Sequence, residues 1–190
     1  MQIVPSSTLR NCAIYQAADQ LRSLSHVAYR TAELNAAWPD HGFGDKERER
    51  WETDPAWQGF RELMENVLVA YDWGESLIAL NVVAKPAVDE CLYRQLAATA
   101  RRHDDNLLAM IADSVYKDVQ RSRTWTTAAL RMAENDNTAT SAIRDWVTKW
   151  RPLMENAVSA YCAALPDSPD AATEVMANVS QWQRSLAVAD

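Results

Sequence analysis

The chain has 190 residues, of which 48% are apolar and only four are glycine, so it is long enough to bury a sizeable core. Its formal net charge of −7 disfavours general attraction to nucleic acid or to an anionic membrane. The sequence starts without the basic and apolar segments of a signal peptide, and no stretch approaches the roughly 18 apolar residues of a membrane span. We therefore expect a cytoplasmic protein.

Helix-forming residues dominate the sequence, and no run of alternating β-branched residues competes with them. The predicted fold is therefore all-α. A first helix is expected over residues 7–35, ending in the proline- and glycine-containing stretch 38–44. The next helix has a clear start, because Asp54 can cap it and Pro55 suits its first position.

The segment that follows is apolar on almost every side over residues 77–83, which is typical of a central helix that is buried all round. Pro86 is predicted to kink this helix or to end it near Ala84, because proline has no N–H and its ring clashes with the preceding turn. A separate helix is then expected over residues 87–102.

Three more helices are predicted in the second half of the chain. The first follows the polar break 103–106 and runs to about Glu134, the second covers residues 139–165, and the last covers residues 171–187. Because no low-complexity linker interrupts the chain, we interpret residues 1–190 as a single domain.

The cysteines and histidines show no pattern that indicates a metal site or a disulfide framework. The cysteines are Cys12, Cys91 and Cys162. They are widely spaced and form no C-x-x-C pair, so we predict reduced, buried thiols. None of the histidines, which are His26, His41 and His103, lies three residues from a glutamate. Metal ligation by these side chains is therefore not expected.

Two of the predicted long helices share the pattern Asp-x-x-Arg-Ser, at residues 19–23 (DQLRS) and 118–122 (DVQRS). In ferritin-like di-iron proteins, two bundle helices each carry Glu-x-x-His. A spacing of three residues puts both side chains on one helix face, so both can reach the same metal pair. The repeated pattern has this spacing.

The repeat resembles the soluble di-iron multicomponent monooxygenases, whose catalytic α subunits carry Asp-Glu-x-Arg-His on two helices. Placed on that pattern, the ligand glutamates fall on Gln20 and Val119, and the ligand histidines fall on Ser23 and Ser122. The resemblance thus implies that all four ligand positions are degenerate, while the surrounding aspartates and arginines remain.

Other segments resemble the β subunits of the hydroxylase component of toluene, phenol and alkene monooxygenases. They are residues 18–22 (ADQLR), 26–34 (HVAYRTAEL), 57–65 (WQGFRELME), 72–75 (DWGE), 80–86 (LNVVAKP) and 149–153 (KWRPL). The resemblance implies a ferritin-like helical bundle with additional C-terminal helices and a non-catalytic, structural role. No cofactor would bind this chain, and the di-iron centre would lie in a partner α subunit. A γ subunit and a second αβγ protomer would complete a complex that uses O₂ and NADH to hydroxylate or epoxidise aromatic or alkene substrates.

β subunits of this kind usually carry a long amino-terminal region before the point where this sequence begins. The resemblance therefore implies that the chain corresponds to the carboxy-terminal part of such a subunit, with a bundle that is incomplete at its N-terminus. Part of an apolar face would then lie open, which favours association.

The four charged residues of the repeat suggest two ion pairs between the helices, Asp19 with Arg121 and Asp118 with Arg22. Such pairs would fill the space that metal occupies in the α subunit, and removal of one partner of a buried pair typically costs about 3–5 kcal/mol. The alternative is that each aspartate pairs locally with the arginine three residues further along a solvated face.

Glu75 lies in the DWGE segment, where the catalytic subunit has a helix with a single ligand carboxylate, and we interpret it as a hydrogen-bonded structural acid. The chain also has eight tryptophans, a residue type enriched in both cores and interfaces. Those near predicted loops, Trp38, Trp51 and Trp57, are the candidate interface residues.

Two other classes of function compete with the subunit interpretation. A small ligand-responsive regulator needs a basic helix-turn-helix near one end, and the first fifty residues contain one long helix and a turn instead. A stand-alone helical enzyme with a ferritin-like metal site needs two Glu-x-x-His pairs, which the sequence lacks. The resemblance implies that the α subunit determines which hydrocarbon is used.

Overall fold

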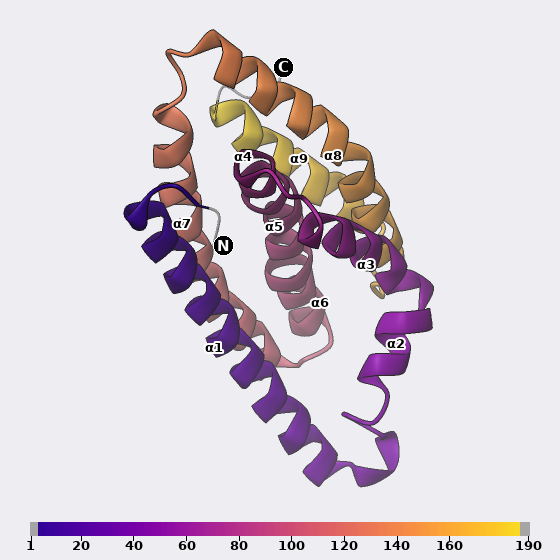
Figure 1. The fold of residues 1–190 in the computed structure, drawn as a ribbon. Coiled ribbons are helices and arrows are strands. Elements are labelled where there is room, and N and C mark those ends of the chain that lie inside the picture. The colour runs from indigo at the N-terminus through magenta and orange to yellow at the C-terminus, as the bar shows by residue number, and fades with distance from the viewer. Residues whose placement is uncertain (1–3, 187–190) are drawn as a thin grey trace.

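The computed structural model describes residues 4–186, which form helices joined by turns with no β-strand in that range. The predicted all-α fold is confirmed. Figure 1 shows α1 (Ser7–Ala37) lying along α7 (Asn106–Arg131) at one edge of the molecule. On the other side, α3 (Pro55–Leu68) and α9 (Ala171–Ser185) pack against α8 (Asn137–Ala163). The short elements η1 (Pro39–His41) and α2 (Glu47–Thr53) connect α1 to α3.

A central helix covering residues 73–102 separates these two groups. It consists of α4 (Trp73–Leu77), the π-helical segment η2 (Ile78–Ala84), α5 (Lys85–Val88), the π-helical segment η3 (Asp89–Gln95) and α6 (Leu96–Arg102). Within it, η2 contacts both α7 and α8, and η3 contacts α7 and α9. The segment that the sequence predicts to be buried all round is therefore the centre of the fold.

The prediction that the helix ends near Ala84 and that a separate helix begins at residue 87 is wrong, because helical structure continues through Pro86. The local hydrogen bonding is π-helical, and the Lys85 N–H donates to the Leu80 carbonyl five residues earlier. In a regular α-helix residue 86 would donate to the Val82 carbonyl, which proline cannot do. The buried side chain of Gln183 donates to that carbonyl instead, at 2.8 Å. A residue that is distant in the sequence thus supplies the hydrogen bond that Pro86 cannot donate.

The remaining helices follow the sequence prediction closely, with boundaries that differ by a few residues. α1 ends at Ala37, α7 ends at Arg131, and α8 begins two residues earlier than predicted, at Asn137. The Asp54 cap is confirmed, since its Oδ1 accepts a hydrogen bond of 3.0 Å from the Ala56 N–H. α9 ends at Ser185, and the predicted end at Ala187 lies outside the described residues.

The main core lies where α3, α8, α9 and the central helix meet, and Leu63, Val82 and Val158 are among its fully buried side chains. Gly59 permits the close crossing of α3 and α8. A Cβ atom at this position would lie 2.6 Å from the Cα atom of Ala157. Because that obstacle is backbone rather than a flexible side chain, any larger residue must separate the two helices. No helix among residues 4–186 is long and apolar enough to cross a membrane.

Replacement of Gly59 by alanine should therefore destabilise the chain. Overpacking typically costs about 1–3 kcal/mol, and the better helix propensity of alanine returns about 1 kcal/mol. Because the obstacle is backbone at 2.6 Å, the cost should lie in the upper part of that range, and we expect a net loss of about 1–2 kcal/mol in the free energy of unfolding, measured by urea denaturation. Gly74→Ala is a matched control, because its Cβ would meet movable side chains at 3.1 Å or more. Equal stability of Gly59→Ala and the parent chain would contradict this packing argument.

Candidate functional site

The two Asp-x-x-Arg-Ser segments lie opposite each other where α1 crosses α7. The Arg121 Nη2 atom lies 2.6 Å from the Asp19 Oδ1 atom, and Arg22 forms an ion pair with Asp118. Arg121 also reaches Asp118 on its own helix, at 3.0 Å. The structure thus brings together both interhelical pairs and one of the local pairs that the sequence suggests.

This group of four charges lies at the edge of the contact between the helices. The aspartate side chains of Asp19 and Asp118 are 17% and 16% exposed, whereas those of Arg121 and Arg22 are 59% and 48% exposed. Partly solvated pairs of this kind contribute at most about 1 kcal/mol each. They therefore position α1 on α7 more than they stabilise the fold.

Three of the four predicted degenerate ligand positions line one narrow space, and Ser23 does not. Val119 and Ser122 are buried, and the Ser122 hydroxyl donates to the Val119 carbonyl at 2.9 Å. Ser23 is also buried, but its hydroxyl lies 3.1 Å from the Tyr93 hydroxyl on the central helix. Gln20 is exposed. The space that Gln20, Val119 and Ser122 line is too narrow for a water molecule.

Lys85 lines the same narrow space, and the sequence analysis missed its role. Its ammonium group lies 2.6 and 2.8 Å from the two carboxylate oxygens of Asp89, one turn further along the central helix. The two side chains are only 11% and 2% exposed. Burial raises the pKa of the Asp89 carboxyl, and the Lys85 ammonium opposes that rise. The i, i+4 spacing of Lys85 and Asp89 is the sequence signal that could have revealed the pair.

These residues do not fit a di-iron centre. Iron sites of the ferritin-like kind need carboxylates and imidazoles that face one another. Here two hydroxyls, a valine and an exposed amide stand at the predicted ligand positions, and the Lys85 side chain, whose ammonium group pairs with Asp89, lines the same space. No group of three or more histidine, cysteine, aspartate or glutamate side chains among residues 4–186 is arranged to hold a metal ion.

Glu90 is the other buried charge of the central helix, with 1% of its side chain exposed. Its carboxylate accepts hydrogen bonds from Tyr116 at 2.9 Å, Arg123 at 2.9 Å, Arg94 at 3.3 Å and Asn178 at 3.1 Å. The donors come from the central helix, α7 and α9, so one carboxylate ties three elements together. With its oxygens engaged in this way, Glu90 has a structural role.

Glu75 also acts between helices. It accepts hydrogen bonds from the Lys149 ammonium at 2.6 Å and from the Trp150 indole at 3.0 Å, which joins α4 to α8. The histidines lie apart: His26 is on α1, His41 stacks on Phe43 in a turn, and His103 follows α6.

Of the candidate interface tryptophans, Trp38 and Trp51 are 52% and 37% exposed. Trp57 instead packs edge-on against Tyr161 with a ring separation of 5.2 Å, and it contacts the main core. Because Trp57 is only partly buried, its interface role stays a prediction. Trp38 and Trp51 remain candidates as well.

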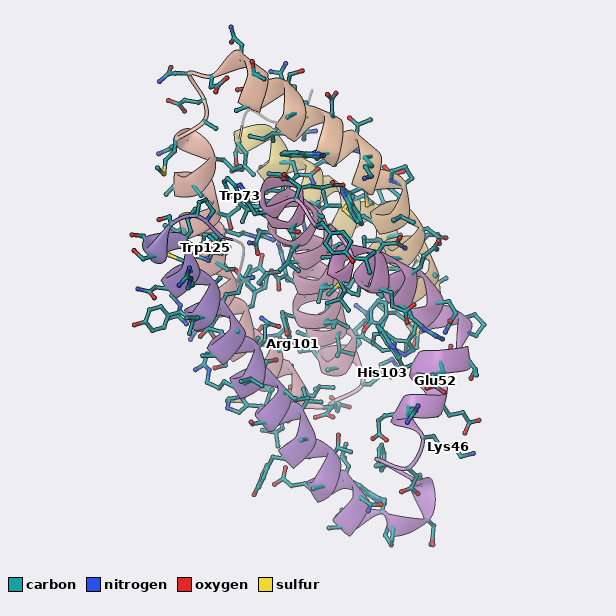
Figure 2. The ribbon with its side chains drawn as sticks, in the orientation of Figure 1. Lys46, Glu52, Trp73, Arg101, His103 and Trp125 are labelled. Carbon is teal, nitrogen blue, oxygen red and sulfur yellow. The ribbon has the colours of Figure 1, made fainter. Side chains whose placement is uncertain are left out.

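A mostly apolar hollow of about 450 Å³ lies between α1, α4 and α7. Leu9, Leu80 and the two tryptophans Trp73 and Trp125, which Figure 2 labels, line it. The Trp125 indole N–H and the Asn81 amide N–H₂ are buried without a hydrogen-bond partner among the described residues. An apolar hollow bordered by unpaired polar groups is incompletely packed.

Removal of the Lys85 charge tests the role of the Lys85–Asp89 pair. Lys85→Met leaves Asp89 buried without its partner, which should cost about 3–5 kcal/mol in the free energy of unfolding at neutral pH. Burial raises the folded-state pKa of the Asp89 carboxyl. Protonation of this carboxyl therefore favours the folded state in acid, and that stabilisation is lost as the pH rises through the folded-state pKa. Removing Lys85 raises the pKa of Asp89 further. The loss of unfolding free energy in Lys85→Met should therefore be smaller at acidic pH than at neutral pH.

Urea denaturation at neutral and mildly acidic pH measures this difference. The control is the double variant Lys85→Met/Asp89→Asn, which should recover much of the lost stability because no unpaired charge remains. A deficit that is independent of pH, or a double variant as unstable as Lys85→Met, would contradict the assignment.

The structure also brings together two cysteines that the sequence analysis treats as separate. The sulfur atoms of Cys91 and Cys162 lie 3.9 Å apart in the main core, and both side chains are buried. Their mutual hydrogen bond and burial raise the pKa of the Cys91 thiol. Cys12 is partly exposed.

Thiol labelling of the folded chain should distinguish these cysteines. With an aromatic disulfide reagent such as DTNB, we expect only Cys12 to react readily, and all three cysteines of the sequence to react in denaturant. The Cys12→Ser variant is the control and should show almost no reaction when folded. Rapid labelling of that variant without denaturant would show that the core is open.

Comparison with known proteins identifies the family. Residues 1–137 match the model of the methane/phenol/alkene hydroxylase family, and the chain belongs to this family. This finding confirms the resemblance inferred from the sequence, and it does not favour a regulator.

Individual relatives are subunits of monooxygenases. The chain is 45% identical to the hydroxylase component subunit beta of the toluene-4-monooxygenase system of Ectopseudomonas mendocina, over 86% of this chain and 50% of that protein. It is 27% identical to the phenol 2-monooxygenase oxygenase component DmpL of Pseudomonas sp. (strain CF600), over 87% and 48%. The propane 2-monooxygenase hydroxylase small subunit of Gordonia sp. (strain TY-5) is 26% identical, over 78% and 41%.

A solved structure of toluene 4-monooxygenase, with toluene bound in its resting active site, contains a similar chain. The match has a TM-score of 0.84 and 45% identity, and it covers 86% of this chain and 55% of that chain. The ferritin-like helical fold of this hydroxylase is therefore the fold of the described residues. The chain spans about half the length of the curated relatives that it matches.

Proposed function

We propose that this chain is a non-catalytic, structural β subunit of a di-iron monooxygenase hydroxylase. It supports an α subunit that carries the di-iron centre. The assembled complex inserts oxygen from O₂ into an aromatic or alkene substrate, with electrons that originate from NADH. The chain itself contributes no metal ligand and no substrate pocket.

One observation carries this proposal: the positions that correspond to metal ligands hold Gln20, Ser23, Val119 and Ser122, beside the buried ammonium of Lys85. The family relationship and the printed names of the relatives support the subunit role. The ion pairs between α1 and α7 also support the proposal, because opposite charges on the two facing helices can keep α1 on α7 without a metal ion.

The proposed assembly has further components. We infer that the α subunit is the direct partner, and that a γ subunit and a second αβγ protomer complete the hydroxylase in the cytoplasm. The exposed Trp38 and Trp51, near the turn between α1 and α3, are candidate contact residues. Asp19, Arg22, Asp118 and Arg121 serve as structural ion pairs.

The proposal is tested by co-expressing the tagged chain with a candidate α subunit from the same organism. Affinity purification and size-exclusion chromatography should yield a complex whose iron follows the α subunit. With a reductase and NADH, oxidation of an aromatic or alkene substrate should require both chains. A chain that never co-elutes with the α subunit, or activity that is equal without it, would refute the subunit role.

A further inference from the structure

Two buried thiols of the main core lie against each other although they belong to different helices. Cys91 is in η3 of the central helix, and Cys162 is in the last turn of α8. Their sulfur atoms are 3.9 Å apart, and 71 residues separate them in the sequence. Atoms at this distance are in van der Waals contact, so no other group lies between the two sulfurs. The pair is therefore placed for a disulfide bond.

Only a small movement separates this arrangement from a covalent bond. The sulfur atoms of a disulfide lie about 2 Å apart, so the two Sγ atoms must approach each other by about 2 Å. Rotation of a cysteine side chain between its staggered rotamers moves the sulfur by a comparable distance. Because η3 and α8 are already in contact, the two backbones can stay nearly in place.

The end of α8 gives a small oxidant a way to reach the pair. Cys162 is 3% exposed, whereas Cys91 is 0% exposed. Ala163 and Ala164, which follow Cys162, are exposed. The last turn of a helix frays readily, because its carbonyl groups have no partners within the helix. Cys162 is therefore the sulfur that an oxidant in solution meets first.

The hydrogen bond between the two thiols also favours Cys162 as the more reactive sulfur. Donation by the Cys91 S–H lowers the pKa of the Cys162 thiol, and burial opposes this effect. The same hydrogen bond and burial raise the pKa of the Cys91 thiol. Because the thiolate is the nucleophile in thiol oxidation, Cys162 should react first and Cys91 second.

We propose that Cys91 and Cys162 form a redox-sensitive pair, which hydrogen peroxide converts into a disulfide within the folded chain. First, the Cys162 thiolate attacks one oxygen of the peroxide. The S–O bond forms, the O–O bond breaks, and the leaving hydroxide takes up the proton that the thiol has lost. The Cys91 sulfur then attacks the sulfur of the sulfenic acid on Cys162. The S–S bond forms, the S–O bond breaks, and water leaves with the Cys91 proton, so two thiols are oxidised while one peroxide is reduced to two water molecules.

The disulfide adds a covalent connection between the central helix and α8. Glu90, which precedes Cys91 in the sequence, ties the central helix to α7 and α9 through hydrogen bonds. None of the donors in that group belongs to α8. A bond from Cys91 to Cys162 joins the same segment to α8 as well, so oxidation fixes the central helix against all three of its long neighbours.

Controlled oxidation of the unmodified chain tests the proposal, with Cys12 as an internal reference. The reduced, folded chain is treated with dilute hydrogen peroxide, which is much smaller than DTNB and so can pass where that reagent cannot. The remaining thiols are then alkylated in denaturant, and the disulfides are mapped by mass spectrometry. We expect Cys91–Cys162 as the predominant disulfide, with recovery of both thiols in dithiothreitol. The same oxidation in urea should give all three pairings of the cysteines in the sequence, because the unfolded chain no longer holds two of the sulfurs together.

The urea midpoint of unfolding gives a second measurement. A disulfide between residues that are 71 positions apart restricts the unfolded chain, so the midpoint of the oxidised chain should be higher by about 1 M. Reduction with dithiothreitol should return the midpoint to its original value. Cys162→Ala is the matched control: it keeps Cys12 and Cys91, so peroxide should leave its midpoint unchanged.

A predominant Cys91–Cys162 bond together with a raised midpoint supports the proposal. Absence of that bond in the folded chain, or the same mixture of pairings in the folded and the unfolded chain, overturns it without the need for any variant. A bond that forms without raising the midpoint also overturns it, because the pair would then be joined only by distorting the fold. These results do not depend on an α subunit, so this proposal and the subunit role can fail separately.

Discussion

The position of α1 on α7 depends on opposite charges more than on apolar packing. α1 and α7 meet through Asp19, Arg22, Asp118 and Arg121. Opposite charges on the two facing helices attract each other and fix how α1 lies on α7. Because the inward face of α1 is polar, several of its apolar residues are exposed among the described residues.

The central helix satisfies its buried polar groups through partners from other elements. Lys85 neutralises Asp89, and donors from the central helix, α7 and α9 converge on Glu90. The π-helical segments alter the register around Pro86, and Gln183 replaces the hydrogen bond that proline cannot make. A buried charge without its partner is costly, so this network makes the position of each helix depend on the others.

The helical class, the long helices and the Asp54 cap could be predicted because periodicity and capping are local properties of the sequence. The continuation through Pro86 could not, because the compensating Gln183 lies 101 residues from Val82 in the sequence. The pairing of Asp19 with Arg121 was predictable from a repeated motif. The proximity of Cys91 and Cys162 carries no local signal. Of the partners of Glu90, only Arg94 is close in the sequence, four residues along the same helix, and the others come from distant helices.

The α1–α7 contact of this chain holds opposite charges, with the ammonium group of Lys85 nearby. The most direct measurement is the iron content of the isolated chain after anaerobic incubation with Fe(II) and removal of loosely bound metal. Our account predicts no iron above the level of a chain-free blank. About two irons per chain, the content of a ferritin-like di-iron site, would contradict it.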